Sequence, residues 1–204
     1  MESQGIAVLG ATGSIGENTL DVVARHPGKF HVTALGAHKN ATRLAEQCHQ
    51  HNARYAVISD SSKAGDLQSA LDQLGCNSEV MTGPSALCEV VRHDETDVVM
   101  AAIVGAAGLE STLEAVTAGK RLLLANKESM VIAGELFQKA AAAHQTSIIP
   151  VDSEHNALFQ VLPENFAEGL ASVGVERLIL TASGGPFLHR DRLSLRDITP
   201  DEAG

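Results

Sequence analysis

The sequence predicts an α/β fold: a Rossmann-type, doubly wound and mainly parallel sheet, followed by part of a second α+β domain. Three observations support this prediction. Short apolar runs alternate with helical stretches over the first 150 residues, a glycine-rich turn joins the first run to the first helical stretch, and the pattern changes after Pro150. Repeated strand–helix units with short connections are typical of a parallel sheet covered by helices on both faces.

Seven apolar runs are the expected strands, and the stretches between them carry apolar residues at the three-to-four spacing of an amphipathic helix. The expected strands are Ile6–Leu9, His31–Leu35, Tyr55–Ile58, Glu79–Met81, Asp97–Met100, Arg121–Leu124 and Ser147–Ile149. The expected helices are Ile15–His26, Thr42–His51, Lys63–Leu74, Ser85–Arg92, Ser111–Ala118 and Ser129–His144. Glycines that follow the first and fifth of these helices favour helix ends there.

Two domains are expected, at residues 1–150 and 151–204, because 204 residues suffice for one domain and part of another. In the second region, Asp152–Leu162 resembles a turn and a short helix. Val173–Thr181 is expected to be a strand, which Ser183-Gly184-Gly185-Pro186 ends. The region therefore reads as the beginning of a domain.

Composition excludes several classes of protein. Fifteen Lys and Arg against 25 Asp and Glu give a net charge of -10, which argues against a nucleic-acid binder. There is no Trp and one Tyr, so stacking platforms for single strands are missing. Three cysteines without a C-x-x-C pair are typical of reduced thiols in a cytosol. The longest apolar run is too short to cross a bilayer and no targeting segment is recognised, so we expect a cytoplasmic protein with no membrane partner.

A glycine-rich turn carries the most specific local signal. Gly10-Ala11-Thr12-Gly13-Ser14-Ile15-Gly16 follows the first expected strand and opens the first helix. Such glycines allow a tight turn, close approach to a pyrophosphate and close packing of helix on strand. The free amides at the helix start then favour an anion. The alternative is a plain glycine turn, which the alternating context disfavours.

The end of the second strand indicates which dinucleotide fits. An NAD site places Asp or Glu there to bind the ribose 2′-hydroxyl, yet residues 36–43 contain no acid. Lys39 and Arg43 can meet the dianionic 2′-phosphate of NADP, and Asn40 can cap the next helix. We therefore predict that NADPH binds more tightly than NADH; the alternative is that both cations are ordinary surface charges.

Short-chain dehydrogenase chemistry is excluded, because Ser59 stands where the lysine of Tyr-x-x-x-Lys would follow Tyr55.

Two further clusters follow expected strands, where open α/β sheets place their sites. In Asn126-Lys127-Glu128-Ser129, the amine of Lys127 can neutralise a substrate oxygen, or it can be a solvated charge at a helix start. Asp152 and Glu154 are two residues apart, so in an extended segment both carboxylates face one side and suit Mg²⁺ or Mn²⁺. From the spacing alone, a capped helix start is the better interpretation of this pair. Ser183-Gly184-Gly185 can form an anion-binding nest or a plain turn.

Taken together, these motifs resemble the 1-deoxy-D-xylulose 5-phosphate reductoisomerase family. The matching segments are Gly10–Gly16, Lys39-Asn40, Asn126–Ser129, the run Pro150–Ala157 and Ala182–Phe187, in the order and spacing of the family. The resemblance implies rearrangement of a metal-bound 1-deoxyxylulose 5-phosphate by retro-aldol cleavage and re-addition. Hydride from NADPH then reduces the resulting aldehyde to 2-C-methyl-D-erythritol 4-phosphate.

The resemblance also implies roles for individual residues, in an NADPH-binding domain at 1–150 and a catalytic domain that begins at 151. Asp152 and Glu154 are then ligands of Mg²⁺ or Mn²⁺ and, with Lys127, catalytic. Lys127, Ser153, Glu154 and Ser183 contact the sugar phosphate substrate. The residues along the cofactor are Gly10, Thr12, Gly13, Ser14, Ile15, Ala37, His38, Lys39, Asn40, Asn126 and Glu128.

Length and one residue depart from the family pattern. His38 stands where similar sequences often have glycine, and family members run to about twice this size. We therefore expect an N-terminal fragment that binds NADPH but does not turn over, from a bacterial cytoplasmic enzyme that is a homodimer at full length. The alternatives are another NADP-dependent dehydrogenase, which would not use Asp152 and Glu154 as metal ligands, and a non-catalytic dinucleotide-binding module.

Overall fold

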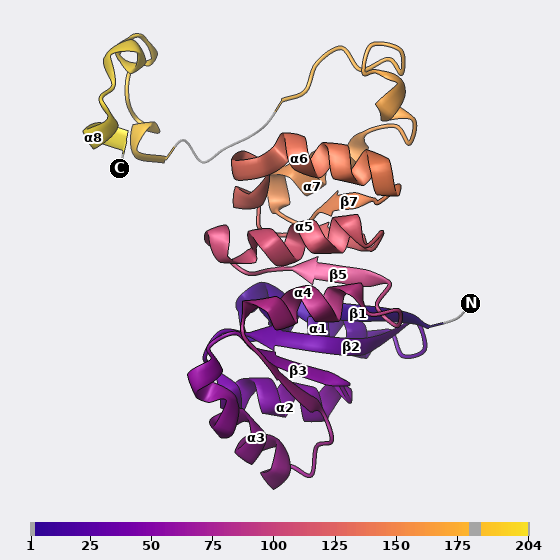
Figure 1. The fold of residues 1–204 in the computed structure, drawn as a ribbon. Coiled ribbons are helices and arrows are strands. Elements are labelled where there is room, and N and C mark those ends of the chain that lie inside the picture. The colour runs from indigo at the N-terminus through magenta and orange to yellow at the C-terminus, as the bar shows by residue number, and fades with distance from the viewer. Residues whose placement is uncertain (1–2, 180–184, 204) are drawn as a thin grey trace. The chain divides into compact units, whose positions relative to one another are not determined.

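A seven-stranded parallel sheet of order β4-β3-β2-β1-β5-β6-β7 forms the centre of the first part of the chain (Figure 1). The computed structural model describes residues 3–179 and 185–203. The strands are β1 (Gln4–Leu9), β2 (Phe30–Ala37), β3 (Tyr55–Ile58), β4 (Glu79–Thr82), β5 (Val98–Ala101), β6 (Arg121–Leu124) and β7 (Ile148–Pro150). The strand order reverses between β1 and β5, so the connections that leave these two neighbours diverge. Open α/β sheets bind ligands at such a switch point.

Helices cover both faces of this sheet. Those of the first part are α1 (Ser14–Arg25), α2 (Ala41–His51), α3 (Ala64–Gln73), α4 (Pro84–Arg92), α5 (Leu109–Thr117) and α6 (Glu128–His144), with short 3-10 helices η1 (Ser61–Lys63) and η2 (Gly105–Gly108). Buried side chains of α1, α2 and α3 belong to one apolar cluster, and those of α4, α5 and α6 to another. The chain thus winds outward on one face and returns on the other, as right-handed crossovers require.

The alternation of side chains along the strands assigns each residue to one of these clusters. In β1, Ile6 and Val8 pack with α1, α2 and α3, whereas Ala7 and Leu9 pack with α4, α5 and α6. All four are almost fully buried. A strand buried on both faces reads as a continuous apolar run, which is why the sequence pattern located the strands well.

The predicted fold class is confirmed, and every expected strand of residues 1–150 is present within two residues of its expected ends. The expected helices are also present, but their starts differ. Helix α1 already begins at Ser14, and α5 begins at Leu109, directly after η2. Helix α6 has a kink at Ala133, where φ is -141° and ψ is 28°.

The chain divides into two compact units, Met1–Asp152 and Ser153–Gly204. The second contains α7 (Ser153–Val161), the 3-10 helices η3 (Phe166–Glu168), η4 (Gly185–Phe187) and η5 (Arg192–Asp197), and α8 (Pro200–Ala203). The short helix expected after Asp152 is therefore present.

The strand expected at Val173–Thr181 is wrong for residues 173–179, which have a turn followed by irregular backbone; the last two residues of that prediction lie outside the described residues. The exposed fractions of Leu178 and Ile179 are 46% and 67%. A strand is stable only when it pairs and buries one face, and within residues 3–179 and 185–203 this segment pairs with no other strand. Its apolar composition alone was therefore insufficient.

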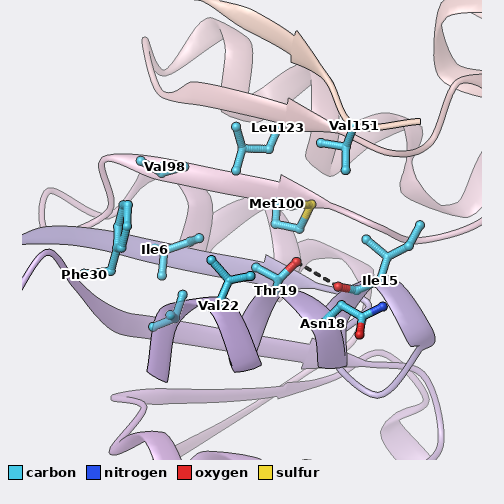
Figure 2. A pocket seen from close by; sticks show the side chains of 11 residues that line it. Ile6, Ile15, Asn18, Thr19, Val22, Phe30, Val98, Met100, Leu123 and Val151 are labelled. Atoms are coloured by element: carbon cyan, nitrogen blue, oxygen red, sulfur yellow. Dashed lines mark hydrogen bonds between the residues drawn. The ribbon is translucent and has the colours of Figure 1, made fainter. Parts of the chain in front are cut away.

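An apolar groove lies between α1 and the neighbouring strands β5 and β6 (Figure 2). Its volume is about 370 Å³, and Val22 and Ile15 of α1 face Met100 and Leu123 across it. On the opposite face of the sheet, α5 and α6 pack against the same two strands. Separately, no helix within the described parts of the chain combines the length and apolar character needed to cross a membrane.

Phe137 and Leu136 are neighbours on α6 that test this packing. Phe137 is fully buried, whereas the exposed fraction of Leu136 is 52%. We expect Phe137→Ala to lower the free energy of unfolding by about 3–5 kcal/mol, because it leaves a cavity against the sheet. Leu136→Ala should lower it by less than about 1 kcal/mol. Urea unfolding of both variants makes the comparison, and equal losses would contradict the assigned face of α6.

Candidate nucleotide-binding site

The turn between β1 and α1 is shaped by backbone contacts that only glycine allows. Gly10 has φ +89°, and a Cβ there would lie 2.6 Å from the carbonyl oxygen of Ala102, at the end of β5. A Cβ on Gly16 would overlap the backbone of Gly10 and Ala11. Both glycines are therefore required by the fold itself, for a tight turn and for the close approach of α1.

Gly13 is different, because the protein makes little demand on it. Its φ is -87°, and a Cβ would lie 3.4 Å from the carbonyl oxygen of Gly10, which is close to ordinary contact. Gly13 is the N-cap of α1, and no side chain caps this helix. Ser14 and Ile15 are the first two residues of α1, so their amides have no acceptor within the helix. The start of α1 thus presents free amides behind a residue without a side chain, an arrangement that suits an anion.

The turn is anchored from two sides. The amides of Gly10 and Ala11 both donate to the carbonyl oxygen of Gly36 in β2, at 2.9 and 2.8 Å. The side-chain amide of Gln47, on α2, donates to the carbonyl oxygen of Ala11 at 2.9 Å. Gln47 is 2% exposed. Sequence reasoning missed this residue, although a glutamine on the buried face of an amphipathic helix is a signal for such a bond.

A cavity of about 450 Å³ lies at the carboxyl ends of the central strands. It is lined by Gly10, Thr12 and Gly13 of the turn, Ala37 and His38 after β2, Ser59 after β3, Pro84 and Leu87 of α4, and Ala102, Ile103, Val104 and Ala107 after β5. Five of the expected cofactor residues are among them. The side chain of Ile15, by contrast, lines the apolar groove beside α1 (Figure 2), so only its backbone is available to a ligand at the turn.

Sequence reasoning missed the walls contributed by α4 and by the segment after β5. Val104 in that segment is 83% exposed, although it is a large apolar residue. A signal was present, because Ala101–Gly108 consists mostly of alanine and glycine directly after a buried strand. Small residues at the end of a central parallel strand leave room for a ligand.

Lys39 follows β2 and Arg43 lies in the first turn of α2, and the fold brings acids to both cations. The side chain of Asn40 accepts a hydrogen bond from the amide of Arg43 at 3.2 Å, so the predicted cap of α2 is confirmed. Arg43 pairs with Glu17 at 2.9 Å and with Glu46 at 3.0 Å. Hydrogen bonds to Glu46 and Glu17 raise the pKa of Arg43.

Lys39 meets an acid from the neighbouring strand. Its Nζ lies 3.9 Å from Oδ2 of Asp60, which follows β3. Hydrogen bonds from the hydroxyl and the amide of Ser62 lower the pKa of Asp60, so its carboxylate is ionised at neutral pH. Residues 36–43 contain no acid, but the fold brings acids from other parts of the chain next to Lys39 and Arg43.

The end of β6 supplies a buried amide. Asn126 is 3% exposed, and its Nδ2 donates to the carbonyl oxygen of Gly105 at 2.9 Å. Within the described residues, Oδ1 of Asn126 and Oγ of Ser129 are buried without a partner. A buried acceptor without a donor is costly in a folded protein. Lys127 is the N-cap of α6 and Glu128 its first residue, and both are exposed.

The remaining candidates are Asp152, Ser153, Glu154 and Ser183. Asp152 ends the first unit, half-buried, whereas Ser153 and Glu154 are exposed residues in the first turn of α7. The segment is therefore not extended, and the geometric reason given for pairing the two carboxylates is wrong. Ser183 lies outside the described residues. Among those that the structure describes, no group of three or more His, Cys, Asp or Glu side chains could hold a metal ion.

The fold and the cavity define the class of the protein: it is a Rossmann-type α/β protein with a glycine-rich turn at the switch point of its sheet. A family model of 1-deoxy-D-xylulose 5-phosphate reductoisomerase matches residues 6–134, and the model of that enzyme's C-terminal domain matches residues 148–204. The chain therefore belongs to the 1-deoxy-D-xylulose 5-phosphate reductoisomerase family. Membership sets aside the alternative of an unrelated NADP-dependent dehydrogenase.

Individual relatives support the same family assignment. The chain is 52% identical over 200 residues to a 1-deoxy-D-xylulose 5-phosphate reductoisomerase of Aromatoleum aromaticum, covering 98% of this chain and 50% of the relative. The Zymomonas mobilis enzyme, solved with NADPH, is 43% identical with a TM-score of 0.85, covering 98% of this chain and 51% of that one. A reductoisomerase solved with NADPH, fosmidomycin and magnesium is 40% identical with a TM-score of 0.85, covering 98% and 50%. The chain spans about half the length of the curated relatives it matches.

Proposed function

We propose that this chain binds NADPH in the cavity at the switch point and contributes to the conversion of 1-deoxy-D-xylulose 5-phosphate to 2-C-methyl-D-erythritol 4-phosphate. The observation that carries the proposal is Gly13. The fold explains Gly10 and Gly16, because a side chain there would overlap with backbone. A Cβ on Gly13 would meet only the carbonyl oxygen of Gly10, at 3.4 Å, and the first-turn amides of α1 follow Gly13 directly. A pyrophosphate needs such an approach.

We assign the parts of the dinucleotide to residues in and near the cavity. Thr12, Gly13 and the first-turn amides of α1 would hold the pyrophosphate. Lys39 and Asn40 would hold the 2′-phosphate, since Lys39 is exposed and reaches beyond the end of β2. The Zymomonas mobilis relative was solved with NADPH, which supports NADPH as the ligand.

The reduced nicotinamide supplies hydride when it is bound, and the chain would orient it. Asn126 and Glu128 follow β6, and the buried Oδ1 of Asn126 is an acceptor in need of a donor. The segment around Gly105, which Asn126 holds by a hydrogen bond, continues into the cavity wall at Ala107. The apolar walls contributed by Ile103 and Leu87 would exclude water from the rings.

We assign the metal to Asp152 and Glu154, and the substrate to Lys127, Ser153, Glu154 and Ser183. Asp152 and Glu154 offer hard carboxylate oxygens, which suit Mg²⁺ or Mn²⁺. Lys127 and Ser153 would contact substrate oxygens, because the side chains of both residues are exposed. Ser183 would hold part of the substrate phosphate. The relative solved with magnesium and fosmidomycin supports a metal site in this family.

The proposal extends to cellular context. A family of bacterial enzymes, a net charge of -10 and the free thiols of Cys48, Cys76 and Cys88 favour the bacterial cytoplasm, without a nucleic-acid partner. For the full-length enzyme we propose a homodimer.

The preference for NADPH is tested by removing one cation. We expect Lys39→Met to raise the Kd for NADPH by about tenfold and to leave the Kd for NADH nearly unchanged, because one charge-assisted contact to the 2′-phosphate is lost. Nicotinamide fluorescence measures both constants. Lys139→Met is the matched control, since Lys139 is an exposed lysine of α6 that pairs with Glu135 at 2.6 Å. Equal losses for NADPH and NADH would refute the assignment.

Turnover is tested on the chain itself. With substrate, NADPH and Mn²⁺, we expect no steady-state loss of NADPH absorbance above background. The reason is that the described residues offer the metal no cluster of three ligands, and incomplete metal coordination costs orders of magnitude in rate. NADPH binding in the same sample serves as the control for folding. Sustained turnover by this chain alone would contradict the expectation.

A further inference from the structure

The subsite expected to bind the 2′-phosphate has more negative than positive charge. Lys39 and Arg43 are its two cations. Within the described residues, the acids in contact with them are Asp60 after β3, Glu17 of α1 and Glu46 of α2. Three carboxylates therefore meet two cations, in a place where a dianion has to bind.

Arg43 already forms ion pairs with two of these acids. Its guanidinium donates to Glu17 through Nε at 2.9 Å and to Glu46 through an Nη at 3.0 Å. Two carboxylates beside one guanidinium give the group a net negative charge, which disfavours a further anion there. Recognition of the 2′-phosphate then rests mainly on Lys39, whose single acidic neighbour among the described residues is Asp60.

The sheet itself places Asp60 beside Lys39. Beyond the last paired residues of β2 and β3, Ala37 and Ile58, the ladder continues: Ser59 donates its amide to Ala37 at 2.9 Å, and Asp60 donates to His38 at 3.0 Å. Side chains on this extension also pair, since Nδ1 of His38 lies 3.0 Å from Oγ of Ser59. His38 and Ser59 line the cavity. The next pair along, Lys39 and Asp60, therefore lies at its rim.

Asp60 is fixed, whereas Lys39 is free to move. One carboxylate oxygen, Oδ1, accepts from the amide of Ser62 at 3.0 Å and from its hydroxyl at 2.7 Å, and so caps η1. The other, Oδ2, faces Lys39. The side chain of Asp60 is 24% exposed and that of Lys39 is 64% exposed. The lysine can leave its partner for a ligand, but the carboxylate stays.

We propose that Asp60 limits the preference of this chain for NADPH over NADH. Its carboxylate competes with the 2′-phosphate for Lys39 and repels that phosphate once it is bound. For NADH, the carboxylate of Asp60 can accept a hydrogen bond from the ribose 2′-hydroxyl. In NAD sites, an acid at the end of the second strand has this role. The inference rests on the proposed function, because it specifies the cofactor selectivity of the same cavity.

Removing the charge should therefore favour NADPH. The ion pair with Lys39 is long and exposed, so its loss costs little stability, while the freed lysine and the lost repulsion both act on the phosphate. The variant Asp60→Asn keeps the oxygen that caps η1, because asparagine is as good an N-cap as aspartate. Asp60→Ser, which also keeps a capping oxygen, provides a second uncharged variant should the first fold poorly.

The experiment measures the Kd of NADPH and of NADH for the unaltered chain, Asp60→Asn and Asp60→Ser, by nicotinamide fluorescence at fixed ionic strength. We expect the ratio of Kd for NADH to Kd for NADPH to rise about three- to tenfold in both variants, through tighter NADPH binding. Asp66→Asn is the matched control: it removes the acid of another exposed Lys–Asp pair, with Lys63 at 2.8 Å, and should leave the ratio unchanged.

The outcomes separate this inference from the proposed function. An unchanged or lower ratio in both Asp60 variants, while NADPH still binds the unaltered chain, would overturn the inference alone. An equal rise in Asp66→Asn would also overturn it, since net charge and not position would then be the cause. If the unaltered chain binds neither dinucleotide, the proposed function fails and the inference with it.

Discussion

The close packing of backbone between the turn after β1 and the end of β5 is the constraint on which the site depends. A side chain at Gly10 would collide with Ala102, and one at Gly16 would collide with the turn itself. These contacts, together with the two amides that donate to Gly36, bring the N-terminus of α1 to the switch point of the sheet. The free amides at this helix start, and the cavity in front of them, are consequences of that packing.

Most of the fold followed from local patterns. Strands buried on both faces appear as apolar runs, and a turn with three spaced glycines located the start of the first helix. The contacts that tune the site could not be predicted in this way, because they join residues far apart in the chain. Asp60 meets Lys39 only because β2 and β3 pair in parallel, and Gln47 reaches Ala11 only because α2 packs beside the turn.

Predictions were weaker after Pro150, and the reason is physical. An apolar stretch becomes a strand only when a partner pairs with it, so composition misassigned residues 173–179. Spacing of two suggested carboxylates on one side of an extended segment, but α7 begins at Ser153 and places Glu154 in a helix. The interpretation of that segment as a helix start correctly predicted its conformation, and the motif at residues 150–157 correctly indicated the family.

Backbone amide spectra of the chain titrated with NADPH test the central claim most directly. The account predicts that the largest nuclear magnetic resonance shifts occur at the amides of Gly13, Ser14 and Ile15, with a further shift at the side-chain amide of Asn126. The proposed cavity is lined by Gly10, Thr12 and Gly13, whereas the apolar groove beside α1 is lined by Val22 and Val98. Shifts confined to Val22 and Val98, in the apolar groove, with the turn unaffected, would contradict it.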